Sequence, residues 1–150
     1  MSPKTSFVLG GARSGTTWLA KIIDSHPDVI YRHEPDIPYP DEILPVFCNA
    51  DDVENHIPLA VKRVEGYLQT RHIRATGVQP IFPKSYLSPF QFNMRKFAIY
   101  FLRFIERFDN LRELSYKLSV PDFIDIGSDS NLCLIKTVNA LGHVLSLIHI

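Results

Sequence analysis

A glycine-rich segment near the N-terminus carries the residues best suited to chemistry. Phe7-Val8-Leu9 is a short apolar run, and Gly10-Gly11-Ala12-Arg13-Ser14-Gly15-Thr16-Thr17-Trp18 follows it directly. An apolar strand that turns through glycines into a helix gathers unsatisfied backbone N–H groups and the positive end of the helix dipole around one point. Turns of this kind bind phosphate-like anions. The sequence therefore predicts an anion site at the start of the first helix.

The residues of this loop differ from those of a nucleoside triphosphate site at one key position. Residues 10–17 have the spacing of a Walker A loop, but Thr16 occupies the position of its lysine. Because that lysine reaches the terminal phosphates of ATP or GTP, a loop without it is poorly suited to phosphoryl transfer. Arg13 can supply the missing charge, and its planar guanidinium suits an oxyanion with three oxygens. The hydroxyls of Ser14, Thr16 and Thr17 complete the predicted site.

Three further residues could act in a transfer reaction. Glu34 follows a second apolar run and is our first candidate for the base that takes a proton from an acceptor hydroxyl. His33 is the alternative base, because its reference pKa lies near neutrality. Neighbouring residues of an extended chain point in opposite directions, so only one of these two is expected to face the acceptor. Lys136 ends a third apolar run and could either stabilise charge in the reaction or reach solvent. Arg32 is expected to be exposed, and binding of an acidic acceptor is its alternative role.

The order of the motifs resembles the sulfotransferases that use 3′-phosphoadenosine 5′-phosphosulfate. The loop is followed by Asp24-Ser25-His26-Pro27-Asp28 and then by His33-Glu34-Pro35, so the specific resemblance covers the chain up to Pro35. The cytosolic branch of that family has lysine at the position of Arg13, and arginine resembles the carbohydrate, tyrosyl-protein and many bacterial members. The resemblance implies that the 5′-phosphosulfate is bound by Arg13, Ser14, Gly15, Thr16, Thr17 and Trp18.

This resemblance implies a sulfotransferase that moves a sulfuryl group from the donor to an acceptor hydroxyl or amine. Glu34 would be the base, and Lys136 would touch the sulfuryl group or the bridging oxygen. The acceptor would be a small molecule or a carbohydrate, with a lipid headgroup and a protein tyrosine also open, and no metal is required. The alternative is a P-loop kinase or NTPase, for which the missing lysine at Thr16 is unfavourable. A noncatalytic module that keeps the loop as a scaffold is the third possibility.

Composition restricts the other classes of function. The chain has 150 residues, enough for one domain with a core, and 45% of them are hydrophobic. The formal net charge is zero, so no overall field favours nucleic acid. Cys48 and Cys133 have no metal-site spacing, and we expect two reduced, mostly buried thiols. The sequence shows no leader and no transmembrane segment, which favours a cytoplasmic protein of bacterial type, and it sets no oligomeric state.

We interpret the last six residues as a technical addition to the natural sequence. Residues 145–150, Leu-Ser-Leu-Ile-His-Ile, are what one frame of a common sequencing adapter would encode. The resemblance also implies an arginine-rich motif for the 3′-phosphate, and nothing after Ile135 supplies it. We therefore expect residues 1–150 to be a single truncated sulfotransferase domain, the N-terminal part of a longer enzyme. Such a fragment should bind the donor weakly or not at all.

The elements that must position these residues follow from the apolar pattern. Buried strands are predicted over 5–9, 29–31 and 132–136, and a helix is predicted over 16–25. Trp18, Leu19, Ile22 and Ile23 have helical spacing and are expected to pack on the sheet, so Trp18 is more readily a core residue than a ligand. The predicted fold is α/β, a parallel sheet of the P-loop NTPase type flanked by helices, here incomplete.

A helical insertion is predicted between the second and third strands. One helix should run from about 51 to 71, with an apolar face of Ile57, Ala60, Val64 and Leu68. A longer helix should run from 89 to 118 with Ser88 as its cap. It carries an apolar stripe of Phe97, Phe101, Phe104, Ile105, Phe108, Leu111 and Leu114. We expect this stripe to pack in the core, and an acceptor-binding lid is the alternative. Residues 141–144 are expected to begin another helix.

Overall fold

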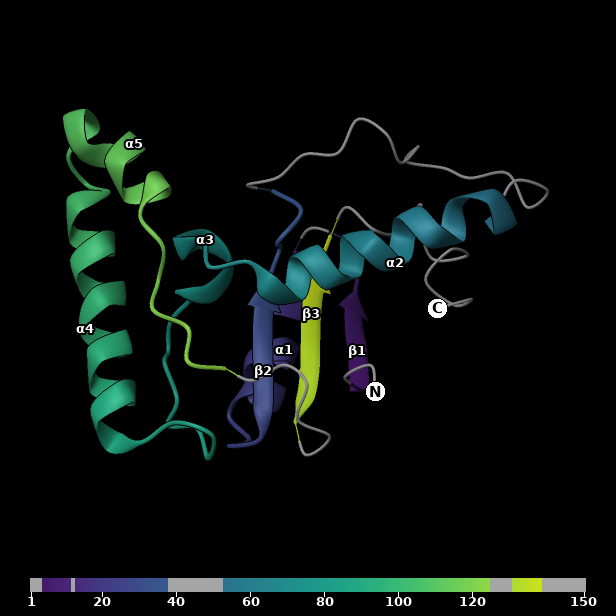
Figure 1. Ribbon diagram of the computed structural model, residues 1–150, viewed down its shortest axis with the longest axis horizontal. Coiled ribbons are helices and arrows are strands. Elements are labelled where there is room, and N and C mark those ends of the chain that lie inside the picture. Colours follow the sequence, from purple (N-terminus) through teal and green to yellow (C-terminus); the bar gives the residue numbers. More distant parts are fainter. Residues whose placement is uncertain (1–3, 12, 38–52, 125–130, 139–150) are drawn as a thin grey trace.

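The computed structural model describes residues 4–11, 13–37, 53–124 and 131–138 (Figure 1). Cys48, the helix expected over 141–144 and the adapter-like residues 145–150 lie outside this part of the chain. The elements in chain order are β1 (Lys4–Leu9), α1 (Thr16–Asp24), β2 (Val29–His33), α2 (Val53–Gln69), α3 (Ile73–Thr76), α4 (Pro89–Ile105), α5 (Asp109–Lys117) and β3 (Leu132–Thr137).

The three strands form a parallel sheet in the order β1-β3-β2 (Figure 1). The last of the described strands lies between the first two, so β1 and β2 both pair with β3 and not with each other. Parallel pairing requires connections that cross over the sheet, and here the connections contain helices. The α/β class, the parallel sheet and its flanking helices are confirmed.

Alternation along the strands gives the sheet two apolar faces. Val8, Tyr31 and Leu134 pack with Ala20 of α1 on one face. Ile30, Cys133 and Ile135 lie on the other face with Val64 and Leu68 of α2. The predicted apolar face of the second helix is thus confirmed at Ala60, Val64 and Leu68, all of which are buried. A strand buried on both faces has a continuous apolar sequence, as β3 does.

The insertion forms a separate core beside β2. Ile99, Leu102 and Ile105 of α4 pack with Ile73 of α3 and with Val120. As predicted, Ser88 caps α4. Its hydroxyl accepts from the Gln91 N–H while the Gln91 side chain accepts from the Ser88 N–H, which makes a capping box. No helix in the described part of the chain is long and apolar enough to cross a membrane.

The prediction of one continuous helix over 89–118 was wrong. The helix ends at Ile105, and a second helix begins at Asp109. The break between them lets α5 fold back against α4, where the Tyr116 hydroxyl donates to Glu106 at 2.9 Å and Ser115 is buried. A straight helix would have carried these groups away from α4.

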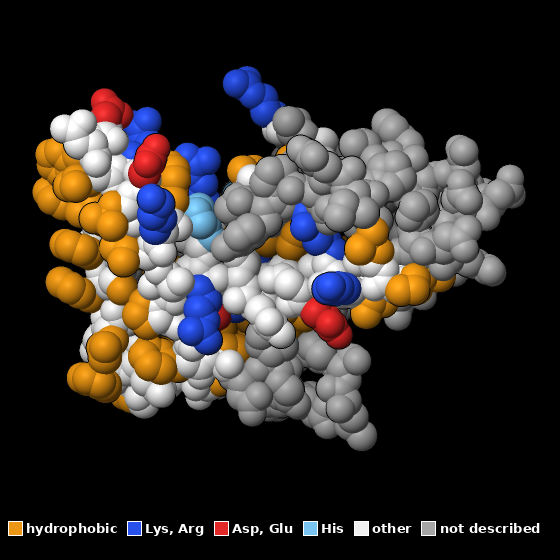
Figure 2. Space-filling view, turned by 45° about the horizontal axis from the view of Figure 1, so that its top comes forward, with side chains coloured by type: hydrophobic (Ala, Val, Ile, Leu, Met, Phe, Trp, Pro, Cys, Tyr) orange, Lys and Arg blue, Asp and Glu red, His pale blue; other side chains and the backbone are white. Residues whose placement is uncertain are grey.

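The prediction that the phenylalanine stripe packs in the core was also wrong. Figure 2 shows hydrophobic side chains along the side of the molecule where α4 and α5 lie. Phe97 is 72% exposed, and of the stripe only Ile105 is buried. The residues of α4 that are buried are Arg95, Ile99, Leu102 and Ile105, of which only Ile105 belongs to the stripe. The buried face of α4 therefore consists mainly of aliphatic residues, whereas Phe97, Phe101 and Phe104 are exposed.

The first strand and helix are less buried than we expected. Within β1 only Val8 is buried, because β1 has a described neighbour on one side only. On α1, Trp18 is 72% exposed, and Leu19 and Ile22 are also exposed, so the prediction that these three pack on the sheet was wrong. The small Ala20 faces the sheet instead, with Ile23 packed beside it. A small residue at this contact lets the helix approach the sheet closely.

Candidate functional site

The glycine-rich loop joins β1 to α1 in a tight turn. Arg13 and Gly15 both have left-handed backbone conformations, with φ of 63° and 79°. The Ser14 N–H and the Ser14 hydroxyl both donate to the carbonyl of Gly11, at 3.2 Å and 2.6 Å, which closes the turn. A Cβ on Gly10 would lie 2.5 Å from Cγ2 of Thr16 and 2.8 Å from Oγ of Ser14. A larger residue at position 10 would therefore require the Ser14 and Thr16 side chains to move, whereas glycine leaves them in place.

The residues of the loop are open to solvent. Arg13, Ser14, Gly15 and Thr17 are exposed and Thr16 is half-buried. The N-cap of α1 is Gly15, which has no side chain to cap the first amides. Backbone N–H groups at an uncapped helix start keep their hydrogen-bonding capacity and lie in the positive field of the helix dipole. The turn is thus open to an anion, with the guanidinium of Arg13 close by in the chain.

The three strands end together at one edge of the sheet. In the register of the sheet, Leu9 pairs with Thr137 and His33 pairs with Lys136. The loop follows Leu9 directly, and Glu34 follows His33. The structure therefore places the loop, Glu34 and Lys136 at the carboxyl edge of the sheet, which is where open α/β sheets bind ligands.

Glu34 and Lys136 form an ion pair at this edge. The Lys136 ammonium donates to Oε1 of Glu34, and the Glu34 N–H donates to the Lys136 carbonyl at 2.6 Å. The Lys136 side chain is 2% exposed and that of Glu34 is 19% exposed. Lys136 does not reach solvent, which excludes one of the two interpretations of this residue. Only the carboxylate of the pair keeps part of its surface accessible.

The prediction that His33 and Glu34 point in opposite directions was wrong. Glu34 has a φ of 41°, outside the extended region, so the alternation of β2 stops there. The turn brings Oε2 of Glu34 to 3.8 Å from Nε2 of His33. Both candidate bases therefore belong to one cluster, in which Lys136 and His33 approach different oxygens of the same carboxylate.

Tyr31 holds the imidazole of His33 from the other side. Its hydroxyl lies 2.7 Å from Nδ1 of His33, and the two rings meet edge to face. Burial lowers the pKa of His33, and the nearby positive charge of Lys136 lowers it further, against the opposite effect of Glu34. His33 is therefore neutral at pH 7. Sequence reasoning did not identify Tyr31, although its position two residues before His33 places it on the same face of β2.

Arg32 is fully buried, which contradicts the expectation that it is exposed. Its guanidinium donates to Asp122 at 2.6 Å and to the carbonyl of Leu68 at 2.9 Å. The same carboxylate accepts from Arg95 of α4 at 2.9 Å. Strand alternation explains the burial, because Arg32 shares the face of Ile30, which α2 covers. A buried arginine needs such partners, and the sequence alone did not locate Asp122 as one of them.

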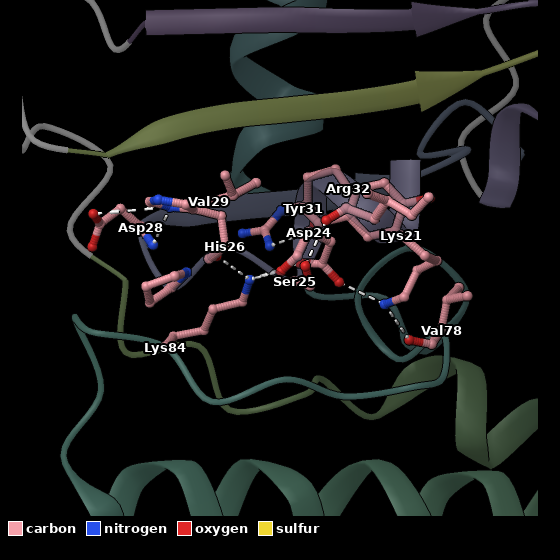
Figure 3. A network of polar contacts seen from close by, with 12 residues as sticks. Lys21, Asp24, Ser25, His26, Asp28, Val29, Tyr31, Arg32, Val78 and Lys84 are labelled. Atoms are coloured by element: carbon pink, nitrogen blue, oxygen red, sulfur yellow. Dashed lines mark hydrogen bonds and ion pairs between the residues drawn. The ribbon is translucent and has the colours of Figure 1, made fainter. Parts of the chain in front are cut away.

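The C-terminal end of α1 is anchored by a second ionic cluster (Figure 3). Asp24 is buried and accepts from Lys21 at 2.5 Å and from Lys84 at 2.8 Å. Lys21 also donates to the carbonyl of Val78 at 3.1 Å, and its ammonium lies 5.2 Å from the centre of the Tyr31 ring. These contacts tie α1 to the segment before α4, so they hold the helix whose other end forms the anion turn.

His26 has a structural role at the end of α1. Its backbone N–H donates to the carbonyl of Ile23, and its ring accepts from the N–H of Asp28. Within the described ranges, no group of three His, Cys, Asp or Glu side chains could hold a metal ion.

Comparison of the chain with protein-family models, with curated proteins and with solved structures gave no significant match.

Proposed function

We propose that the chain is part of a sulfotransferase that uses 3′-phosphoadenosine 5′-phosphosulfate. The observation that carries the proposal is the meeting of two features at one edge of the sheet. These are an open, uncapped anion turn with an arginine in it and a carboxylate–lysine pair. The fold we propose is the P-loop type, and the order β1-β3-β2 is compatible with the N-terminal part of such a sheet. From the sequence we also propose a cytoplasmic location.

The residues of the turn fit the anionic end of this donor. Arg13 and the N–H groups of Gly15, Thr16 and Thr17 would hold the 5′-phosphosulfate, with the hydroxyl of Thr17 as a further donor. Trp18 was placed in the same motif by resemblance, and its exposed ring is available to a ligand. The donor supplies an activated sulfuryl group, which needs no metal for its transfer.

The carboxylate–lysine pair would serve the acceptor. Glu34 would take the proton of the acceptor hydroxyl as the acceptor oxygen bonds to sulfur and the bond between sulfur and the phosphate oxygen breaks. Lys136 lies against the same carboxylate. It would move from Glu34 to the sulfuryl or bridging oxygen and stabilise the negative charge that develops there. The acceptor class we propose is a hydroxyl or amine on a small molecule or carbohydrate.

Donor binding can be tested on the chain itself by following backbone amide signals in NMR. We expect 3′-phosphoadenosine 5′-phosphosulfate at high concentration to shift the signals of residues 13–17, and the Arg13→Ala variant to lose most of these shifts. Arg112→Ala is the matched control, because Arg112 is half exposed on α5 and pairs only with Asp109 among the described contacts. Donor shifts of equal size in the wild-type chain and in Arg13→Ala would contradict the proposal.

A P-loop kinase or NTPase is the competing class. ATP with Mg²⁺ should shift the turn less than the sulfated donor does, because Thr16 replaces the lysine that reaches terminal phosphates. Larger shifts with ATP and Mg²⁺, accompanied by ATP turnover, would favour the competing class. Micromolar donor affinity would overturn a different expectation, namely that the chain lacks the site for the 3′-phosphate.

A further inference from the structure

The cluster around Glu34 contains two side chains for which the proposed reaction has no role yet. Tyr31 and His33 both lie on the face of β2 that α1 covers, and their polar atoms are 2.7 Å apart. They form a chain of contacts from the interior of the domain to the carboxylate at the sheet edge. The direction of the hydrogen bonds along this chain can be worked out from the surroundings of each group.

We assign Tyr31 as the donor in its contact with His33, because the Glu34 carboxylate lies nearest to the other ring nitrogen, Nε2, and its negative charge favours an N–H there. Burial raises the pKa of Tyr31, and the carboxylates of Asp24 and Glu34 raise it further. The phenol therefore keeps its proton throughout the physiological range and has an O–H available to donate to Nδ1. Tyr31 is buried and its ring lies under the ammonium of Lys21 at 5.2 Å, so the ring is held in place.

The tautomer of His33 follows from this bond. A neutral imidazole has one N–H and one acceptor nitrogen. If Nδ1 accepts from Tyr31, the proton of the ring must lie on Nε2. Nε2 is the atom nearest to Glu34, 3.8 Å from Oε2. This distance is too long for a hydrogen bond but close enough for the N–H dipole to act on the carboxylate.

The two oxygens of Glu34 consequently differ. Oε1 is taken by the ammonium of Lys136. Oε2 faces the His33 N–H without a full hydrogen bond, so it has lone pairs left for a ligand. A carboxylate whose two oxygens are distinguished in this way presents one of them to an incoming proton donor.

We propose that Tyr31 and His33 are positioning residues for Glu34, in which the Tyr31 hydroxyl fixes the Nε2–H tautomer of His33 and the His33 N–H orients Oε2 as the proton-accepting oxygen. The role of Oε2 as proton acceptor in a reaction rests on the proposed function. The tautomer and the contact with Glu34 are properties of the free chain and do not require the donor.

The tautomer can be measured by NMR on the chain labelled with ¹⁵N, because the protonated and unprotonated ring nitrogens give separate signals. The chain has six histidines, and loss of one signal set in His33→Asn assigns the ring. We expect His33 in the wild-type chain to be the Nε2–H tautomer. A predominant Nδ1–H tautomer would overturn the proposal, and this measurement needs no variant of Tyr31.

Two variants test the contacts on either side of the ring. In Tyr31→Phe the His33 ring should be a mixture of the two neutral tautomers. In Tyr86→Phe it should remain the Nε2–H tautomer. Tyr86 is the matched control, because it is a largely buried tyrosine whose hydroxyl contacts the carbonyl of Val29 and not His33. Glu34→Gln should move the Nε2 signal of His33. Unchanged His33 signals in both Tyr31→Phe and Glu34→Gln would overturn the proposal.

These results are separable from the proposed function. Donor shifts in the turn that Arg13→Ala leaves unchanged, together with an intact Nε2–H tautomer, would reject the sulfotransferase proposal alone. Shifts in the turn with the other tautomer would reject the role of Tyr31 and His33 alone.

Discussion

The buried carboxylate of Asp122 should contribute more to stability than any surface charge of the described chain. Its side chain is 6% exposed, and it accepts from Arg32, which is 0% exposed, and from Arg95. Asp122→Ala would leave two arginines without their shared anion. Removing one partner of a buried ion pair costs about 3–5 kcal/mol, because the remaining charge stays desolvated. Since domains have a total stability of about 5–15 kcal/mol, this loss is a large fraction of the whole.

Urea unfolding followed by circular dichroism measures this effect. We expect the free energy of unfolding to fall by about 3–5 kcal/mol in Asp122→Ala. Asp109→Ala is the matched control: the Asp109 side chain is 84% exposed and pairs with Arg112 on the surface. Exposed pairs contribute about 0–1 kcal/mol, so the control should lose little. If the two variants lost equal stability, the assignment of Asp122 as the buried counterion of two arginines would be refuted.

Four other changes test separate features of the structure. Gly15→Ala should lower the free energy of unfolding by about 1–2 kcal/mol in urea titrations, because φ is +79° there, whereas Gly11→Ala, where a Cβ has open space, should not. Lys136→Met should raise the pKa of His33 in an NMR titration, because the Lys136 charge lowers that pKa; a fall would contradict the contact. The lowered pKa of His33 means that the unfolded chain binds its proton first, so unfolding curves at several pH values should show stability falling as pH drops below about 6.5. His33→Asn should remove that part of the pH dependence. Burial raises the pKa of the Cys133 thiol, so thiol reagents should modify it slowly in the native chain and rapidly in urea; equal rates would show that β3 is accessible.

Local patterns were sufficient to predict the strands and most helices. The apolar runs at 5–9, 29–31 and 132–136 each correspond to an observed strand within one or two residues, because a continuous apolar run between turn residues indicates a buried strand. Ser88 was identified as a cap from its position before Pro89, since serine caps and proline in the first turn favour a helix start.

Long-range packing could not be read from these patterns. The phenylalanines at 97, 101 and 104 have helical spacing, but periodicity does not say which face of a helix meets the rest of the chain. The aliphatic residues Ile99 and Leu102 had the same spacing on another face and formed the core. Arg32 was misjudged for a related reason, because its burial depends on Asp122, a residue 90 positions away.

The candidate site was predicted in its parts but not in its arrangement. The sequence indicated the loop, Glu34 and Lys136 as site residues, because each lies at or directly after the end of an apolar run that predicts a strand. It did not indicate the left-handed Glu34, which places the carboxylate beside His33. A backbone conformation of this kind depends on the register of two strands, since Glu34 donates its N–H to the carbonyl of Lys136.

The bridge made by Asp122 also restricts how the molecule can move. One carboxylate joins β2, through Arg32, to α4, through Arg95. Movement of α4 away from the sheet would leave a buried guanidinium without its carboxylate partner. A hinge motion at this point therefore has a high energetic barrier. Arg32 is two residues before Glu34 in the same strand. The helical insertion and the strand that carries the proposed base therefore behave as one mechanical unit, and slow amide exchange should extend from α4 into β2 without a boundary.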